Sequence, residues 1–309
     1  MVLMIERVLH NGVRMPAIGL GTYPLMGDAL YQSVSNAYDT GYRLIDTADN
    51  YYNEADLGNA LNRIYIQGAK REEFFLVTKI SDELYHPNEL GGGRNKGKYF
   101  WKNSPIMQKP NAVHDVVKSK VEDSLQKLKT DYIDLLLMHW PYPDYFEEIW
   151  FEMERVYQEG KVRAIGVCNC RERHLERLKK TARIMPMVNQ FETSPLNTKE
   201  GLLSYCDENK VQVMVYSPLM TLRMLDNYGG YASLLNEICL KYKKTVAQIV
   251  LRYDVQRGLI PIPKSSSRER LQQNIDIFDF GLSAEEMKML SACNINLQTL
   301  PESKSCPGL

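Results

Sequence analysis

The stretch Gly41–Glu54, GYRLIDTADNYYNE, decides the fold of this chain. Within it, Arg43–Ala48 has the short length and apolar centre of a buried strand, and a polar, aromatic turn follows. Glu54–Ile66 then places apolar residues at the spacing of one helix face. Asp46 and Tyr51 therefore lie where a strand gives way to a loop. In parallel α/β folds, chemistry is carried out at this end of the strands.

The same alternation of strand and helix continues along the chain. The expected strands are Ala17–Thr22, Arg43–Ala48, Phe74–Ile80, Ile133–Trp140, Ala164–Asn169, Met187–Glu192, Val211–Leu219 and Leu259–Ser265. The expected helices between them are Asp28–Thr40, Glu54–Ile66, Ala112–Leu128, Tyr145–Gln158, Arg171–Lys180, Thr198–Asn209 and Val246–Gln256. Eight strands alternating with helices over about 250 residues predict a (β/α)8, or TIM, barrel. We expect a single domain spanning residues 1–309.

Three segments depart from this alternation. Arg7–Ile18 is typical of a β-hairpin that turns at Asn11-Gly12. Ser81–Asn111 is a long connection after the third strand, and so long a loop in a compact domain is usually functional or disordered. It either covers or lines the substrate pocket, or it is a mobile surface loop. Asn294–Leu309 is polar and predicts an irregular tail.

Composition excludes several classes of function. The 309 residues carry 38 basic and 38 acidic side chains, so net charge gives no reason to expect nucleic acid or an anionic membrane as a partner. No apolar run approaches the roughly 20 residues that cross a bilayer, and we expect a cytoplasmic protein without a signal peptide. The six cysteines are scattered, which favours free thiols over disulfides, and the five histidines lack metal-ligand spacing.

The sequence DTADNYYNE resembles the signature of the aldo-keto reductase family, in which an aspartate and, five residues on, a tyrosine enter the active site. A lysine and a histidine follow at the ends of the next two expected strands, Lys79 in EEFFLVTK and His139 in DYIDLLLMHWP. The resemblance runs from the hairpin to the sequence LSAEEM at 282–287. It implies a barrel whose floor is closed by the N-terminal hairpin.

Carbonyl reduction by a nicotinamide needs a hydride donor and a proton donor. A free tyrosine, with a pKa of about 10, is a weak acid near neutrality, and a neighbouring ammonium lowers that pKa. The resemblance implies that Tyr51 is the general acid, that Lys79 is the ammonium and that Asp46 keeps Lys79 charged. It implies that His139 orients the carbonyl oxygen. Tyr52 is the rival acid, but the five-residue offset from Asp46 selects Tyr51.

The resemblance also implies NADPH as cofactor, extended across the barrel mouth, since no Gly-x-Gly-x-x-Gly follows a strand. Its nicotinamide and pyrophosphate are implied to contact Asn169, Gln190, Tyr216, Ser217 and Leu219. Its 2′-phosphate is implied to contact a basic helix N-terminus, with Lys264, Ser265, Arg270, Gln273 and Asn274. Cys168 stands where the family usually has serine, a stronger hydrogen-bond donor. Core packing for Tyr216 and a buried amide for Gln190 remain structural alternatives.

The substrate pocket implied by the resemblance is aromatic and apolar and is formed by Tyr23, Leu25, Tyr52 and Trp140. We expect a small-molecule carbonyl substrate and a monomer or a weak homo-oligomer. Two other functions stay open at this point. One is a catalytically weak NADPH-binding sensor or partner protein of the same fold. The other is an aldolase in which Lys79 forms a Schiff base.

Overall fold

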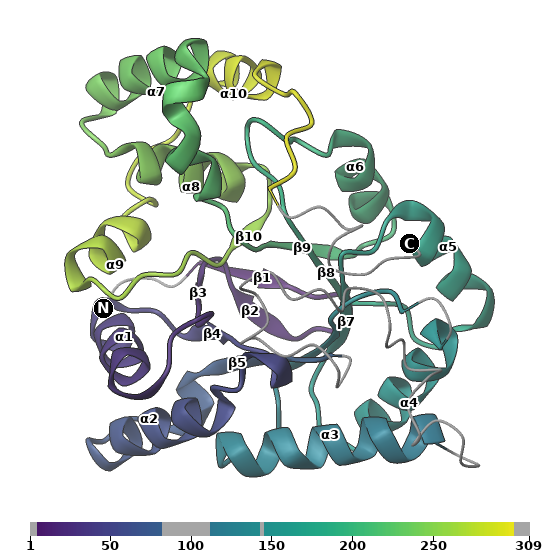
Figure 1. The fold of residues 1–309 in the computed structure, drawn as a ribbon. Helices are drawn as coiled ribbons and strands as arrows, with labels where there is room; N and C mark the ends of the chain where they lie inside the picture. The colour runs from purple at the N-terminus through teal and green to yellow at the C-terminus, as the bar shows by residue number, and fades with distance from the viewer. Residues whose placement is uncertain (1–4, 82–111, 143–144, 300–309) are drawn as a thin grey trace, which may run out of the picture.

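A computed structural model describes residues 5–81, 112–142 and 145–299, and the strands of this part form two sheets (Figure 1). One sheet is a two-stranded antiparallel hairpin, and the other has eight parallel strands. The strands are β1 (Glu6–Val8), β2 (Arg14–Pro16), β3 (Gly19–Gly21), β4 (Leu44–Asp46), β5 (Phe75–Ile80), β6 (Leu135–Met138), β7 (Ile165–Cys168), β8 (Val188–Phe191), β9 (Gln212–Val215) and β10 (Ile260–Pro261).

The eight-stranded sheet closes on itself. Its order runs from β3 to β10, so each strand pairs with the next one along the chain. The amide of Gly21 donates to the carbonyl oxygen of Pro263 at 3.2 Å and joins the first strand to the last. This approach suits glycine, because a Cβ at Gly21 would lie 3.0 Å from the carbonyl oxygen of Ile262. The predicted (β/α)8 barrel is confirmed.

The helices surround the strands in Figure 1. They are α1 (Gly27–Thr40), α2 (Glu54–Ile66), α3 (Ala112–Leu128), α4 (Phe146–Gln158), α5 (Glu172–Thr181), α6 (Glu200–Glu208), α7 (Gly229–Tyr242), α8 (Val246–Gln256), α9 (Arg268–Ile275) and α10 (Ala284–Ala292). Short 3-10 helices are η1 (Asp49–Tyr51), η2 (Arg71–Glu73) and η6 (Met220–Asn227). All six residues of β5 are buried, as expected for a strand that is covered on both faces.

The hairpin forms the floor of the barrel. The Asn11 side chain donates to the carbonyl oxygen of Arg163, just before β7, at 3.0 Å. The Arg7 guanidinium donates to the carbonyl oxygen of Val255, near the end of α8, at 2.9 Å. Met15 is fully buried and belongs to the same apolar cluster as the first residues of several barrel strands. The hairpin thus covers the N-terminal ends of the strands and leaves their C-terminal ends to the opposite rim.

Two helices differ from the sequence expectations, and every barrel strand is shorter than its expected range, β9 and β10 by the most. α7 and α10 were not expected, and α7 begins with two glycines, which disfavour helix interiors. β9 and β10 are shorter than the predicted Val211–Leu219 and Leu259–Ser265. Ser217 turns the chain away after β9 with a φ of 51°. Pro261 and Pro263 have no amide hydrogen for a ladder bond, which limits β10.

Two expectations fall largely outside the described residues. The hypothesis for Ser81–Asn111 concerns residues 82–111, so only Ser81 can be placed. Of the expected tail Asn294–Leu309, residues 294–299 are described and contain neither helix nor strand. Their backbone nevertheless has fixed partners, because the amides of Ile295 and Leu297 both donate to the carbonyl oxygen of Leu196.

Helix α2 packs against the backbone of α3 at Gly58. A Cβ there would lie 2.1 Å from the carbonyl oxygen of Lys127, which is backbone and cannot rotate away. We expect Gly58→Ala to lower the free energy of unfolding by about 2 kcal/mol, the usual cost of overpacking, in urea titrations. In the control Gly201→Ala, the nearest atom is a glutamate side-chain oxygen at 3.4 Å, and stability should be retained. Equal stability of both variants would contradict close packing at Gly58.

A buried carboxyl gives the barrel a pH-dependent stability. Glu54 is 1% exposed and accepts a hydrogen bond from the Thr78 hydroxyl at 2.6 Å. Burial raises the pKa of Glu54 from 4.5 to about 7, although the Thr78 hydrogen bond acts to lower it. The folded state therefore holds a proton that the unfolded state has released between these two pH values. Stability from this group is complete below the unfolded pKa and is lost as pH rises through the folded pKa.

We expect the wild-type protein to lose about 3 kcal/mol relative to Glu54→Gln when the pH rises from about 4.5 to about 7.5. The glutamine keeps an acceptor for Thr78 but does not ionise. The measurement is the difference in free energy of unfolding between the two proteins at several pH values. A difference that does not change with pH would contradict the raised pKa.

Candidate active site

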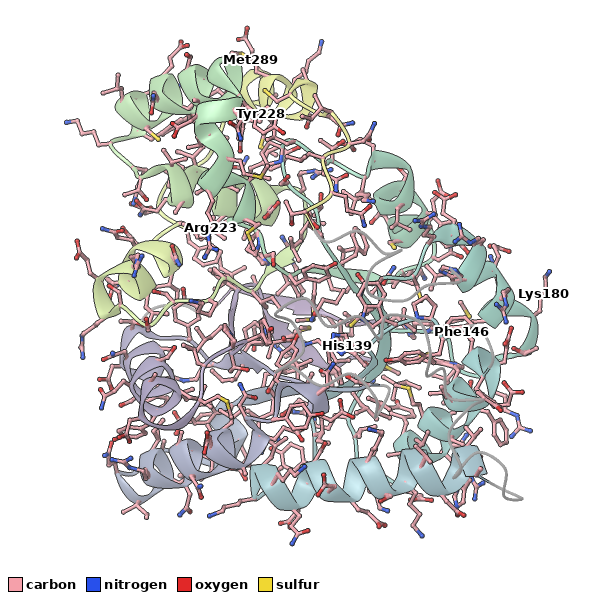
Figure 2. All side chains as sticks on the ribbon, viewed as in Figure 1. His139, Phe146, Lys180, Arg223, Tyr228 and Met289 are labelled. Carbon is pink, nitrogen blue, oxygen red and sulfur yellow. The ribbon has the colours of Figure 1, made fainter. Side chains whose placement is uncertain are left out.

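Side chains from three neighbouring strand ends meet at the rim opposite the hairpin. Asp46 is the last residue of β4, Lys79 the next to last of β5, and His139 directly follows β6. Tyr51 ends η1, the turn that follows β4. We call these four residues the tetrad. His139 lies near the middle of the ring of helices in Figure 2. The strand order brings together the four residues that the sequence singled out.

A buried ion pair forms the centre of the tetrad. Lys79 Nζ lies 2.6 Å from Asp46 Oδ1, and their side chains are 1% and 3% exposed. Lys79 Nζ also donates to the carbonyl oxygen of Thr47 at 2.8 Å. Burial alone would lower the pKa of Lys79, but the Asp46 carboxylate outweighs it and raises that pKa above its ordinary value. Lys79 is therefore an ammonium at neutral pH.

Tyr51 lies against this ammonium. Lys79 Nζ is 3.4 Å from the Tyr51 hydroxyl oxygen and 4.9 Å from the ring centroid. Burial raises the pKa of Tyr51 to about 12, while Lys79 lowers it, as expected from the sequence, by a smaller amount. Tyr51 therefore keeps its proton at neutral pH. The neighbouring Tyr52 is 45% exposed and has a left-handed backbone with a φ of 54°.

His139 completes the tetrad as a neutral ring. Its imidazole meets the Tyr51 ring edge-on, with centroids 5.9 Å apart. Burial and the positive charge of Lys79 hold the pKa of His139 well below its usual range. Its Nδ1 lies 2.6 Å from the Ser81 hydroxyl oxygen. Ser81 was not anticipated as a site residue, although it follows Lys79 by two positions and shares its face of the strand.

Two amides link the tetrad to the next strands. Gln190 on β8 donates from Nε2 to the second oxygen of Asp46 at 2.8 Å, a contact that was not anticipated. Asn169 follows β7 and donates from Nδ2 to the carbonyl oxygen of His139 at 3.2 Å. The Tyr216 hydroxyl donates to Asn169 Oδ1 at 2.9 Å. Cys168, beside Asn169, is buried, and burial raises the pKa of its thiol. The residues expected at the nicotinamide thus adjoin the tetrad.

The other expected cofactor residues lie where β9 and β10 end. Ser217 and Leu219 are half-buried in the turn between β9 and η6. Lys264 and Arg270 are exposed, and neither forms a salt bridge within the described residues. Three expected cofactor residues remain. Ser265 and Asn274 are buried, and the Gln273 side chain donates to the Glu269 carboxylate at 3.4 Å.

The N-terminus of α9 lies between Lys264 and Arg270. Ser267 caps this helix by accepting from the amide of Arg270 at 3.3 Å. Arg268 takes a different direction, because it pairs with Asp39 on α1 at 3.1 Å. The capped N-terminus and two basic side chains without acidic partners suit a phosphate group.

Aromatic side chains border the tetrad, as expected for the substrate pocket. The Tyr23 ring lies 5.0 Å from the Tyr51 ring and is 38% exposed. The Trp140 ring stacks 6.4 Å from His139 and is 8% exposed. Leu25 is half-buried, and its carbonyl oxygen accepts from Asn53. Together with exposed Tyr52, these side chains give the rim an apolar and aromatic character.

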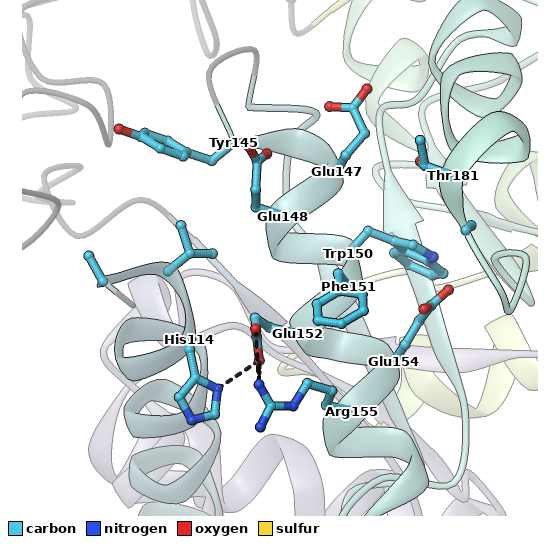
Figure 3. Close-up of a pocket in the computed structure, with 13 residues that line it drawn as sticks. His114, Tyr145, Glu147, Glu148, Trp150, Phe151, Glu152, Glu154, Arg155 and Thr181 are labelled. Carbon is cyan, nitrogen blue, oxygen red and sulfur yellow. Dashed lines mark hydrogen bonds and ion pairs between the residues drawn. The ribbon is translucent and has the colours of Figure 1, made fainter. Parts of the chain in front are cut away.

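A cavity of about 830 Å³ lies elsewhere, between α3, α4 and the end of α5 (Figure 3). No tetrad residue lines it. Its wall contains His114, whose Nδ1 lies 2.7 Å from Glu152, and Arg155, which contacts the same carboxylate at 3.3 Å. Glu154 accepts from the backbone amides of residues 183 and 184. The charged side chains named here are all paired with other groups of the protein, and the cavity is separate from the tetrad.

Other classes of site receive no support from the described residues. Among residues 5–81, 112–142 and 145–299, no three histidine, cysteine or carboxylate side chains are grouped as metal ligands. No helix of this part is long and apolar enough to span a bilayer. Five cysteines of the described residues form no disulfide, and Cys168, Cys170 and Cys206 among them are buried, while Cys306 lies outside the described residues.

Comparison with known proteins agrees with the fold. Residues 17–295 match the sequence model of the Aldo/keto reductase family. Glyoxal reductase of Bacillus subtilis is 39% identical over 287 residues, covering 93% of this chain and 91% of that protein. Methylglyoxal reductase of Escherichia coli K12 is 34% identical over 286 residues, covering 90% of each.

Solved structures extend the similarity to three dimensions. A Bombyx mori aldo-keto reductase, crystallised in complex with NADP, superposes with a TM-score of 0.80 at 32% identity and covers 98% of this chain and 97% of that chain. An aldo-keto reductase from Brucella melitensis gives a TM-score of 0.79 at 32% identity, covering 94% and 100%. On its fold, its sequence and its solved relatives, this chain belongs to the aldo-keto reductase family of oxidoreductases.

Proposed function

We propose that the protein reduces an aldehyde or ketone to an alcohol with NADPH. The observation that carries this proposal is the contact between a protonated Tyr51 and the buried Lys79–Asp46 pair, beside a neutral His139. When bound, the reduced nicotinamide supplies a hydride to the carbonyl carbon. Tyr51 gives its hydroxyl proton to the carbonyl oxygen as negative charge develops there. Hydride and proton together complete the alcohol.

The neighbours of Tyr51 assist this transfer. The Lys79 ammonium, 3.4 Å from the hydroxyl, stabilises the phenolate left behind. Asp46 holds Lys79 in its charged form, and Gln190 fixes the second carboxylate oxygen. His139 orients the carbonyl oxygen by a hydrogen bond. The charged Lys79 disfavours the aldolase alternative, because a Schiff base requires a neutral amine.

The cofactor would be held by residues of four strand ends. Asn169 and Gln190 would bind the carboxamide, and Tyr216 would face the nicotinamide ring. Ser217 and Leu219 would lie along the pyrophosphate. The 2′-phosphate would be bound by Lys264 and Arg270 at the start of α9, with Ser265, Gln273 and Asn274 beside them. The preference for NADPH over NADH rests on these basic side chains, which lack acidic partners in the described chain.

The substrate would enter between Tyr23 and Trp140, with Leu25 and Tyr52 at the rim. An aromatic pocket of this kind suits small carbonyl compounds without strong charge. The relatives named for glyoxal and methylglyoxal reduction support small aldehydes and dicarbonyls as the substrate class. A panel of such compounds, followed by the loss of NADPH absorbance, tests the proposal. Tight NADPH binding without turnover on the whole panel would instead favour the sensor function.

The role of Tyr51 can be tested by one substitution. Tyr51→Phe removes the proton donor but keeps the ring, so kcat should fall by about a thousandfold. The dissociation constant for NADPH, measured by fluorescence titration, should stay within a factor of about two of wild type, because loss of the donor removes no proposed cofactor contact. Tyr38→Phe on α1 serves as the matched control and should turn over normally. Near-normal turnover by Tyr51→Phe would contradict the assignment of the acid.

The choice of cofactor can be tested at α9. Arg270→Met removes one charge-assisted contact to the 2′-phosphate, so NADPH should bind between about 10-fold and 100-fold more weakly. Binding of NADH, which lacks this phosphate, should not change. Arg268→Met is a matched control, because Arg268 is engaged with Asp39. A similar loss for both nucleotides would mean that Arg270 supports the fold of the helix rather than the phosphate.

A further inference from the structure

Ser81 connects the tetrad to a second set of charged residues. It directly follows β5 and is 1% exposed. Its hydroxyl oxygen lies 2.6 Å from His139 Nδ1, and the hydroxyl has no other hydrogen-bond partner among the described residues. In a neutral imidazole, one ring nitrogen carries a hydrogen and donates, while the other has none and accepts. The contact with Ser81 therefore decides which nitrogen of His139 carries the hydrogen.

The direction of the hydrogen bond follows from the buried hydroxyl. If Nδ1–H donated to Ser81, the Ser81 hydrogen would remain buried without an acceptor in the described structure. Such an unsatisfied donor is costly. If Ser81 donates to Nδ1, its hydrogen is satisfied and the ring hydrogen resides on Nε2. A hydrogen on Nε2 is what His139 needs in order to donate to a carbonyl oxygen, because an unprotonated nitrogen would repel that oxygen.

Ser81 is itself held in place by Asp49 and Lys120. The backbone amide of Ser81 donates to both carboxylate oxygens of Asp49, each at 3.1 Å. Lys120 on α3 pairs with the same carboxylate at 2.8 Å, and both side chains are largely buried. Asp49 begins η1, the turn that ends at Tyr51. One carboxylate therefore fixes Ser81 relative to the turn that carries the proposed acid.

We propose that Ser81 is a positioning residue that holds His139 in the Nε2–H tautomer. This proposal rests on the proposed function, because a donor at Nε2 has a role only where His139 binds a carbonyl oxygen. The same bond also sets the plane of the imidazole. Ser81 thereby selects between a ring that binds the substrate oxygen and a ring that rejects it.

The tautomer can be observed without turnover. In the full-length protein labelled with ¹⁵N-histidine, long-range ¹H–¹⁵N spectra distinguish the protonated from the unprotonated ring nitrogen, and the His139 signals are those missing from His139→Gln. We expect Nδ1 to be unprotonated in wild type and in Ser81→Thr, which keeps the hydroxyl. Ser81→Ala should give a mixture of tautomers. A protonated Nδ1 in wild type, or an unchanged spectrum in Ser81→Ala, would overturn the proposal.

Kinetics then connect the tautomer to catalysis. Ser81→Ala should lower kcat by about tenfold, the factor that corresponds to one lost hydrogen bond, and Ser81→Thr should restore most of it. Ser291→Ala is the matched control, because it removes a hydroxyl with a comparable 2.7 Å contact to Tyr253, far from the tetrad on α10. If the tautomer shifts but kcat does not, the tautomer held by Ser81 does not matter for catalysis, and the proposed positioning role in the reaction is overturned. Failure of the proposed function is recognised separately, because the wild-type protein would then turn over no compound of the carbonyl panel, while the tautomer could still be observed by NMR.

Discussion

The buried pair of Lys79 and Asp46 is the interaction on which the site depends. Two opposite charges inside a barrel are expensive to desolvate. They are tolerated only when their remaining N–H groups and lone pairs also form hydrogen bonds. Here the backbone of Thr47 accepts from Lys79, and Gln190 donates to Asp46. The pair therefore binds β4, β5 and β8 to one another at the rim. The position of the Tyr51 hydroxyl is defined relative to this fixed charge.

Burial gives the tetrad its protonation pattern. The same low-polarity environment keeps Tyr51 protonated and His139 neutral, while the local carboxylate keeps Lys79 charged. A more open rim would weaken the effects on Tyr51 and His139, because water would stabilise a phenolate and an imidazolium. The closed barrel therefore sets the protonation states of these side chains as well as their positions. It produces a proton donor and a neutral hydrogen-bond donor from two side chains that titrate differently in water.

Much of the fold could be predicted from the sequence because it depends on local pattern, whereas the tetrad was indicated by the resemblance to the aldo-keto reductase family. The strand periodicity and the offset from Asp46 to Tyr51 are visible along the chain, as is the position of Lys79 at a strand end. Contacts between distant segments were not visible. The donation from Gln190 to Asp46 depends on how β4 and β8 curve around the barrel, and the role of Ser81 depends on the neighbouring strand. Helix α7 was missed because its first turn contains two glycines.

The two ends of the described chain lie at opposite ends of the barrel. The hairpin at residues 6–16 closes the floor, whereas the amide and hydroxyl of Thr299 both donate to Glu192, which directly follows β8 at the rim. The backbone of residues 295–299 therefore runs beside the mouth of the barrel. This arrangement matters for anyone who immobilises or labels the protein. An attachment made through the hairpin end leaves the rim open, whereas a bulky group attached at Thr299 starts at the rim, beside the end of β8.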